Sequence, residues 1–276
     1  MTLIAAWIRK NSNLKELVLA SDSRVSGGES WDTCPKLVAL PRPATAIAMS
    51  GDATAAYAFL LHAINTCTLL DGHQSGRSDI GYLANKLRVL YAASRREVSD
   101  LPLGQSAPDV VTLNVVLVGW SWRNLCFEGY SYRYDKNGHL QMRRLPSLAE
   151  NSWGSFYFAG DASRTAQART WVRIRNNGYP LMHDSEDPEK LANETFLNWE
   201  PLETLLDVIA DPSARTVGGA PQLMKIYQYG ECESFVWRDA NGSFYGGREI
   251  DEKERFDRRI ASFSNGDLTT EMPPRP

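Results

Sequence analysis

Apolar positions along the chain fall into short continuous runs, and these runs alternate with longer helical patterns. A run of four to eight apolar residues is typical of a strand that is covered on both faces. Apolar residues that recur every three or four positions predict a helix. On this basis we predict strands at residues 3–8, 17–20, 36–40, 44–49, 110–120, 125–134, 155–159 and 221–229. Helices are predicted at residues 53–65, from an N-cap at residues 78–79 to about residue 98, at residues 163–175, and after a polar stretch at residues 180–188 to about residue 209.

Turn residues indicate how these elements connect. Asn11, Ser12 and Asn13 separate the first two strands, and residues 135–138 (DKNG) and 239–242 (DANG) predict two further hairpins. If the first turn is centred on Ser12, antiparallel pairing places Thr2 opposite Asp22. A hydroxyl at the second position of the chain is then set beside a carboxylate by local pairing alone.

The order of elements predicts the architecture. Strands, two helices, strands, two helices and strands follow one another, with no linker rich in Gly, Ser or Pro between them. We therefore predict an α+β fold, a four-layer αββα sandwich of two stacked antiparallel sheets flanked by helix pairs. One domain is expected over residues 1–230, followed by a C-terminal hairpin and charged extension over residues 231–276, with a solvated helix at residues 249–259.

Composition narrows the classes of partner. The 276 residues include 30 Lys and Arg against 33 Asp and Glu, so there is no basic excess to follow a nucleic acid backbone. Four scattered cysteines without a CxxC pair predict neither a metal site nor disulfides, and they fit a reducing compartment. No apolar stretch has the length of a membrane span. We expect a cytoplasmic protein that has no metal, no cofactor and no membrane contact.

Thr2 is the candidate of greatest chemical interest. An initiator Met is removed when the next residue is small, and the chain would then begin with a threonine. Its α-amino group, with a pKa of about 7.7–8.0, is a suitable general base for the hydroxyl of the same residue. Taken alone, a threonine at position 2 is common and carries no function, so the argument depends on the residues that accompany it.

Several segments, in order, resemble successive motifs of proteasome β-subunits and of their bacterial relatives, such as the peptidase HslV and the ring- or helix-forming β-like proteins. The match is strongest over the first sixty residues and extends more weakly to about residue 230, so it looks like a distant bacterial branch. The matching segments are residues 2–5 (TLIA), 19–24 (LASDSR), 36–37 (KL), 49–51 (MSG), 158–163 (FAGDAS) and 217–221 (VGGAP).

The resemblance implies an N-terminal-nucleophile hydrolase domain over residues 1–230. Thr2 would attack an amide carbonyl and form an acyl-enzyme, Lys36 would hold its ammonium beside the Thr2 hydroxyl, and Asp22 would fix Lys36. The backbone N–H of Gly51 would stabilise the oxyanion, which also agrees with a glycine between a strand and a helix N-terminus. The resemblance further implies a hydrophobic substrate pocket lined by Val25, Cys34, Val38, Met49 and Ala53.

The chain departs from the family pattern in the groups that support the terminal amine. Asp161 stands where the family has serine, and residues 214–217 (ARTV) replace its Asp-x-x-Ser. Asp161 or Ser163 is expected to take over this support, with Asp211 and Thr216 as further candidates. A catalytically silent assembly subunit therefore stays open as the alternative. A phosphate-handling enzyme with Asp22 as nucleophile is disfavoured, because Arg24 stands where a second aspartate would be needed.

The family also implies partners. We expect a peptide or protein substrate and a homo-oligomer in the form of a ring or helical stack. The sequence does not specify an unfoldase or other regulator.

Overall fold

The structure is a computed structural model. It describes residues 2–11, 14–26, 29–75, 77–105, 109–145, 148, 156–179, 196–251 and 253–273. Two sequence expectations, the turn at residues 12–13 and the polar stretch at residues 180–188, lie outside these ranges.

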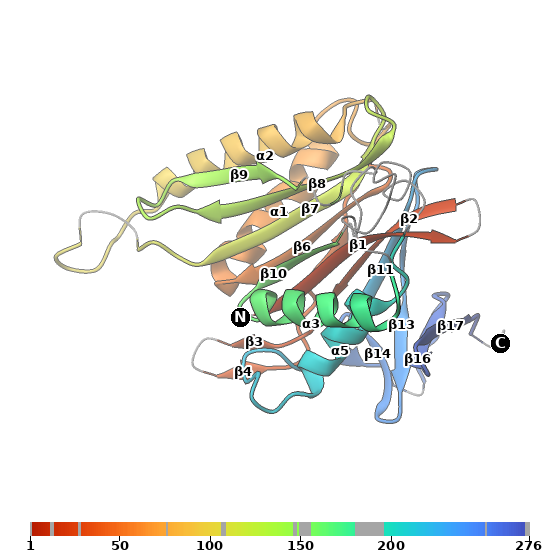
Figure 1. Ribbon diagram of the computed structural model, residues 1–276. Coiled ribbons are helices and arrows are strands. Elements are labelled where there is room, and N and C mark those ends of the chain that lie inside the picture. The colour runs from red at the N-terminus through yellow and green to blue at the C-terminus, as the bar shows by residue number, and fades with distance from the viewer. Residues whose placement is uncertain are drawn as a thin grey trace.

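The first sheet contains the N-terminal hairpin. Its strands run antiparallel, and β1 is flanked by β10 and β2 (Figure 1). In spatial order the strands are β10 (Phe156–Gly160), β1 (Leu3–Asn11), β2 (Leu14–Ser21), β11 (Gln222–Tyr227) and β12 (Cys232–Ser234).

The second sheet is a meander in which neighbours in the sheet are also neighbours in the chain. Its strands are β5 (Leu37–Ala39), β6 (Thr45–Gly51), β7 (Leu113–Ser121), β8 (Cys126–Tyr134) and β9 (Leu140–Arg144). The predicted DKNG turn joins β8 to β9, so this hairpin is confirmed. The two sheets face each other across an apolar layer to which β1, β2, β6 and β7 contribute, with Ile4, Leu19, Ala46 and Val118 among its residues.

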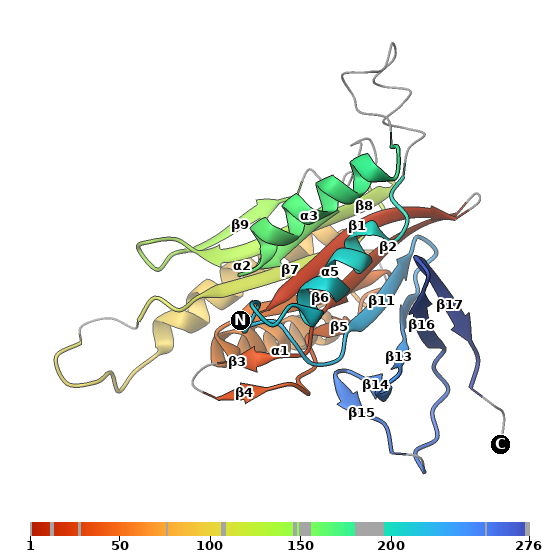
Figure 2. The same ribbon diagram turned by 60° about the horizontal axis from the view of Figure 1, so that its bottom comes forward.

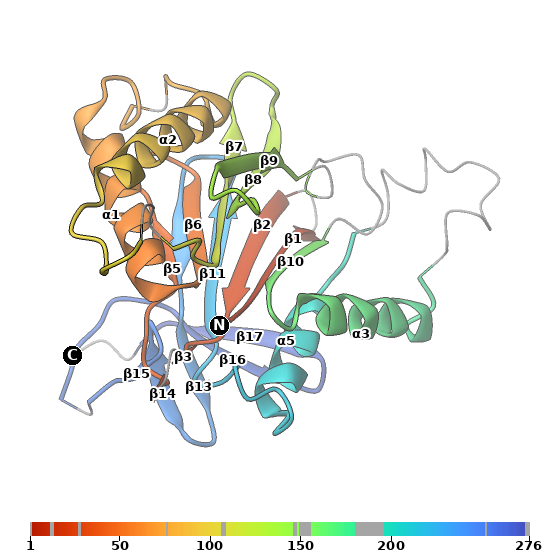
Figure 3. The same ribbon diagram turned by 90° about the vertical axis from the view of Figure 1, so that its left-hand side faces the viewer.

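Helices cover the outer faces of these two sheets (Figure 3). On the second sheet lie α1 (Ala53–Leu69) and α2 (Ile80–Ser94), which continues as a short 3₁₀ turn (Arg95–Glu97). On the first sheet lie α3 (Ser163–Asn176) and α5 (Glu200–Ala210). Aspartates cap the first two helices: a carboxylate oxygen of Asp52 accepts from the N–H of Ala55 at 2.8 Å, and one of Asp79 accepts from Gly81 at 3.3 Å.

Residues after β12 build a third five-stranded sheet (Figure 2). Its strands are β15 (Arg248–Glu249), β14 (Gly242–Tyr245), β13 (Val236–Asp239), β16 (Ile260–Ser264) and β17 (Asp267–Glu271). The pairing of β13 with β16 is parallel, whereas the other pairings in this sheet are antiparallel. A separate two-stranded ribbon consists of β3 (Val25–Ser26) and β4 (Ser30–Trp31).

The predicted αββα sandwich of two sheets flanked by helix pairs is therefore wrong. The described residues form four α-helices and 17 strands in four mostly antiparallel sheets. The apolar cluster on the outer face of the first sheet shows the physical reason, because α3 and α5 share it with the third sheet. Trp237 and Ala261 of that third sheet, and Phe235 just before it, lie in the same cluster as Trp199 and Leu205 of the α5 region.

The C-terminal region was predicted less well than the core. The hairpin at residues 239–242 is present between β13 and β14, but the solvated helix expected at residues 249–259 is wrong, since the described residues of that stretch contain no helix. The strands β16 and β17 were not predicted. The domain boundary at residue 230 stays a prediction; β12, just beyond it, still pairs with β11 of the first sheet.

The register of the first hairpin differs by one residue from the expected one. Ile4 pairs with Ser21 and Asn11 with Leu14, so Thr2 is not placed directly opposite Asp22. Asp22 lies just beyond the end of β2, where its N–H donates to the carbonyl of Leu3 at 3.3 Å. The carboxylate thus reaches the start of β1 from the end of its neighbour rather than from across the ladder.

His73, between α1 and α2, is fully buried, and neither ring nitrogen has a hydrogen-bond partner in the described part of the chain. Burial lowers the pKa of His73 from its ordinary value of about 6.5, and the Arg42 guanidinium lowers it further. The unfolded chain therefore takes up this proton more readily, so the stability is complete above about pH 6.5 and declines as the pH falls toward the folded-state pKa.

We expect His73→Leu to remove this part of the pH dependence. Wild type should lose on the order of 1 kcal/mol more unfolding free energy than the variant between pH 7.5 and pH 5.5. Urea unfolding of both proteins at several pH values measures the difference. If the unfolding free energies of the two proteins change in parallel with pH, His73 is not the source of this pH dependence.

Candidate active site

Three side chains from separate parts of the chain meet at one end of the two central sheets. Thr2 precedes β1, Asp22 follows β2, and Lys36 precedes β5 of the other sheet. The Nζ of Lys36 donates to Thr2 Oγ1 at 2.6 Å and to Asp22 Oδ1 at 3.0 Å. The three residues are 2%, 0% and 1% exposed, respectively. The expected convergence is thus present, and it is shielded from water.

Backbone N–H groups hold the Asp22 carboxylate in place. Oδ1 accepts from Leu3 at 3.0 Å, and Oδ2 accepts from Gly218 at 3.0 Å and from Arg24 at 3.2 Å. Hydrogen bonds to an ionised acceptor are stronger than neutral ones. Together with Lys36, these donors fix both carboxylate oxygens and stabilise the ionised form.

The Lys36 ammonium has three N–H donors, and three acceptors surround it. In addition to Thr2 and Asp22, it donates to the backbone carbonyl of Arg24. All of its donors are therefore used in one orientation. A lysine held in this way cannot rotate freely, so its charge stays directed at the Thr2 hydroxyl.

Burial shifts the pKa values of Asp22 and Lys36 in opposite directions. It raises the pKa of the Asp22 carboxyl, while Lys36 and the amides of Leu3 and Gly218 oppose the rise. It lowers the pKa of Lys36, while Asp22 and more weakly Cys34 and Asp32 oppose the fall. Lys36 consequently gives up a proton more readily than an exposed lysine.

The backbone around Gly160 positions Thr2. Gly160 has a φ of +100°, and a Cβ there would lie 1.8 Å from the carbonyl oxygen of Thr2, so only glycine fits. The N–H of Asp161 donates to that same oxygen at 3.2 Å. The Asp161 side chain is exposed and that of Ser163, the first residue of α3, is half-buried.

The supporting roles expected for Asp161 and Ser163 stay predictions. The hydrogen bonds of Asp22 and Lys36 include neither residue. The hydrogen bond from the Asp161 N–H to the Thr2 carbonyl joins two backbone atoms, so it does not depend on the identity of the Asp161 side chain.

Gly51 ends β6 beside this cluster. The N–H of Met49 donates to the Lys36 carbonyl at 3.1 Å, on the β5 side of the strand. Because strand N–H groups alternate between the two neighbours, we expect the Gly51 N–H to point to the same side. The strand β5 begins at Leu37, so this N–H lies beyond the ladder, toward the end of the sheet where Lys36 and Thr2 meet.

Gly51 also has a required conformation. Its φ is +101°, and a Cβ would come within 2.2 Å of the Thr112 carbonyl oxygen. The turn from β6 into α1 therefore depends on glycine at this position.

The residues predicted to line a substrate pocket lie near this cluster in the chain, because each is within two residues of Arg24, Lys36 or Gly51. Met49 and Cys34 are buried, whereas Val25, Val38 and Ala53 are half-buried. Met49 and Val38 belong to the apolar cluster beneath α1 and α2. A pocket formed by this set stays a prediction.

The structure adds two side chains that the sequence did not indicate. Arg24 forms a two-bond ion pair with Asp32 (Nε to Oδ1 at 2.6 Å, Nη2 to Oδ2 at 2.8 Å). The pair links the residue before β3 to the residue after β4. Gln222, the first residue of β11, is buried and its amide reaches the backbone of Cys34 and Lys36. Neither a lone Arg-Asp pair nor one glutamine before an apolar strand has a recognisable spacing signal.

The third sheet also contacts these segments. A Cβ built at Gly247, in the turn between β14 and β15, would lie 2.6 Å from the side chain of Ser23, and one at Gly246 would lie 3.5 Å from Pro35. The turn therefore packs directly on residues adjacent to Asp22 and Lys36.

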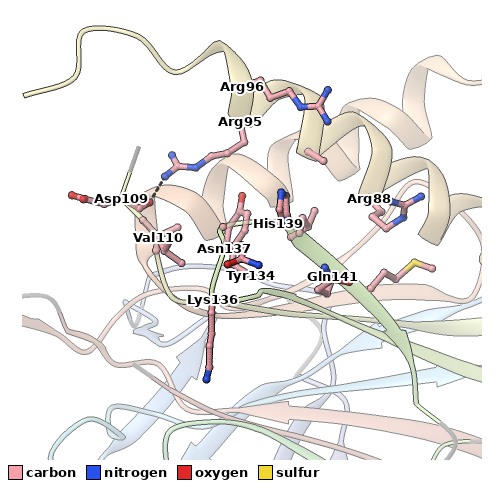
Figure 4. Close-up of a pocket in the computed structure, with 15 residues that line it drawn as sticks. Arg88, Arg95, Arg96, Asp109, Val110, Tyr134, Lys136, Asn137, His139 and Gln141 are labelled. Carbon is pink, nitrogen blue, oxygen red and sulfur yellow. Dashed lines mark hydrogen bonds between the residues drawn. The ribbon is translucent and has the colours of Figure 1, made fainter. Parts of the chain in front are cut away.

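A cavity of about 810 Å³ lies elsewhere, between the end of α2 and the β8–β9 hairpin. Arg88, Arg95 and His139 are among its lining residues, and Arg95 donates to the backbone carbonyl of Asp109 at 2.7 Å (Figure 4). Its lining shares no residue with the Thr2 cluster. Arg95 directly follows the C-terminus of α2, where a basic side chain also complements the helix dipole without a ligand.

Among the described residues, no group of three or more His, Cys, Asp and Glu side chains is arranged to hold a metal ion. Within the same part of the chain, no helix has both the length and the apolar character needed to cross a membrane. Comparison of the sequence with protein-family models and with curated proteins found no match.

Proposed function

We propose that this protein is a threonine-type N-terminal-nucleophile hydrolase that cleaves peptide or other amide bonds once Met1 has been removed. The observation that carries the proposal is the buried contact of 2.6 Å between Lys36 Nζ and Thr2 Oγ1. A buried lysine is costly unless it has partners. Here its partners are a hydroxyl nucleophile and the carboxylate of Asp22, the set that threonine acyl transfer requires.

In the proposed reaction, the free α-amine of Thr2 accepts the hydroxyl proton while Oγ1 attacks the amide carbonyl. The C–N bond then breaks, the leaving amine takes a proton from the ammonium so formed, and an ester to Thr2 remains. Water attacks this ester with the same amine as base, which releases the acid and restores Thr2. Throughout, the Lys36 ammonium stabilises negative charge on Oγ1.

Gly51 completes the proposed site. Its N–H, directed toward the Lys36 side of β6, would donate to the oxygen of the tetrahedral intermediate. A donor that is fixed by a strand end and by the following helix requires no reorganisation during the reaction. The uncharged pocket proposed around Val38 and Met49 would accept a hydrophobic side chain before the cleaved bond.

The alternative, a catalytically silent assembly subunit, is favoured by one observation. Asp161, at the position expected to support the terminal amine, has an exposed side chain, and its backbone N–H donates to the Thr2 carbonyl at 3.2 Å. Against this alternative stands the cost of a buried Lys36–Asp22 pair, which a purely structural subunit would not need.

The N-terminus provides the first test. Intact-mass measurement of the purified protein should give a mass lower by one methionine residue, because threonine at position 2 permits removal of Met1. Incubation of this processed form with a panel of short peptide amides should then release the amine product. If Met1 is fully retained, no free amine is available on Thr2 and the enzyme proposal fails.

The proposed setting is a homo-oligomer in the cytoplasm that acts on peptide or protein substrates. In the described part of the chain, Cys34, Cys67, Cys126 and Cys232 form no disulfide, which is compatible with a reducing compartment. Exposed apolar side chains on α1 and α2, such as Leu61, Leu69 and Val89, provide a surface that a second copy would cover. Sedimentation equilibrium measures the assembly directly.

A further inference from the structure

The contact of Asp22 with Lys36 joins segments of two different sheets. Asp22 continues β2 of the first sheet, whereas Lys36 leads into β5 of the second. The Lys36 side chain can reach Thr2 only if residues 34–36 are held at a fixed distance from the end of β2. The backbone of this short segment therefore decides the geometry of the site.

The segment comes before the β5 ladder, and Pro35 has no N–H to donate. Its remaining backbone groups are bonded individually. The N–H of Cys34 donates to the Ser23 carbonyl at 3.1 Å, and the Pro35 carbonyl accepts from the Tyr57 hydroxyl at 3.1 Å. Two groups on either side of Pro35, the Cys34 carbonyl and the Lys36 N–H, need another partner.

The carboxamide of Gln222 supplies both bonds. Its Oε1 accepts from the Lys36 N–H at 3.0 Å, and its Nε2 donates to the Cys34 carbonyl at 2.9 Å. A residue of an adjacent β-strand would make the same two bonds on either side of Pro35. The side chain thus replaces a strand neighbour where none is present.

The same amide also faces the Asp22 side. Nε2 lies 3.3 Å from the Asp22 carbonyl oxygen and 3.4 Å from Ser23 Oγ. Backbone pairing of Gln222 with Ser21 places its own Cα in the first sheet, beside the end of β2. Gln222 is 5% exposed, so these bonds do not compete with water.

We propose that Gln222 is a positioning residue, which sets the position of the Lys36 ammonium relative to Thr2 Oγ1 and Asp22 by bonding both sides of Pro35. The inference rests on the proposed function, because its effect is expressed in the reactivity of Thr2. Glutamine is the residue that fits: glutamate lacks the donor, leucine lacks both groups, and asparagine is one methylene shorter.

The test measures acylation of Thr2 by a β-lactone probe, followed by intact mass, for wild type, Q222L and Q222E. The maximal rate of acylation should fall roughly 10- to 100-fold in Q222L, while the probe concentration that gives half of this rate changes less than about twofold. Q222E keeps the acceptor for the Lys36 N–H and should lie between wild type and Q222L. If Q222L does not fold, Q222E still tests whether Gln222 positions Lys36.

The pH profile separates positioning from general destabilisation. Asp22, Asp32 and Cys34 are the acidic groups that face Lys36, and burial keeps its pKa below the ordinary value. Loosening residues 34–36 in Q222L admits water, which raises the pKa of Lys36 toward its ordinary value. The alkaline limb of the acylation profile should therefore move to higher pH. The matched control is T204V, which removes a buried hydroxyl of α5 that accepts from Thr170 of α3 and donates to the Glu200 carbonyl. T204V should lower the unfolding temperature without changing the acylation rate or the alkaline limb of its pH profile.

The outcomes distinguish the two proposals. A wild-type protein that reacts, with Q222L reacting at the same rate and with the same alkaline limb, overturns the role of Gln222 and leaves the proposed function intact. A processed wild-type protein that does not react at Thr2 overturns both.

Discussion

Thr2→Ala is expected to abolish covalent labelling by epoxyketone and β-lactone probes. The variant loses the oxygen that would form the ester, and the Lys36 ammonium 2.6 Å from that oxygen then has no nucleophile to activate. Alanine is also small, so removal of Met1 should proceed as in wild type. Intact mass after incubation with the probe measures both events in one spectrum, because a processed chain without adduct differs from an unprocessed one.

The fold should be nearly unaffected by this substitution. Thr2 is buried, so the loss of a methyl and a hydroxyl group is expected to cost on the order of 1 kcal/mol of unfolding free energy. Thr2→Ser, which keeps the hydroxyl, should still be labelled. Equal labelling of the Thr2→Ala variant and wild type would remove Thr2 from the mechanism.

Lys36→Ala is expected to slow acylation by roughly 10²- to 10³-fold, the effect of removing one donor beside a developing oxyanion. The variant should also be less stable by about 3–5 kcal/mol, because the fully buried Asp22 carboxylate loses its counter-charge. Acylation rates are compared at a temperature at which circular dichroism shows the variant to be folded.

Two controls separate these effects. Lys225→Ala removes another largely buried lysine, which pairs with Glu16 at 3.2 Å in the first sheet, and should leave acylation unchanged. The double variant Lys36→Met with Asp22→Asn eliminates the buried charges together and should regain stability, while its acylation stays slow. Acylation near the wild-type rate in this double variant would exclude Lys36 from the chemistry.

The hairpin at the start of the chain predicted that Thr2 and Asp22 lie close together, whereas the place of Lys36 beside them was implied by the family resemblance. The hairpin register was nevertheless wrong by one residue. Asp22 still reaches the site because it lies past the end of β2, where its carboxylate accepts from Leu3 and Gly218. A residue beyond the end of a strand is less restricted by the ladder than one within it.

Apart from its β13–β14 hairpin, the third sheet was beyond sequence reasoning, and so was Gln222, for two different reasons. The strands β13 to β17 are two to five residues long and largely exposed, so their apolar pattern is too short to be distinguished from a loop. Gln222 acts through bonds to residues 186 and 188 positions earlier, and such separation leaves no local pattern. Both features follow from tertiary packing rather than from propensity.

The packing of the Gly246–Gly247 turn against Ser23 and Pro35 matters for any shortened version of this protein. Ending the chain at residue 230 would appear harmless on a diagram of secondary structure, since the residues that carry the proposed chemistry precede that point. It would nonetheless remove the turn that packs on Ser23 and Pro35, together with Phe235 and Trp237, which share an apolar cluster with Trp199. Fragments meant for expression or crystallisation should therefore extend through Glu271.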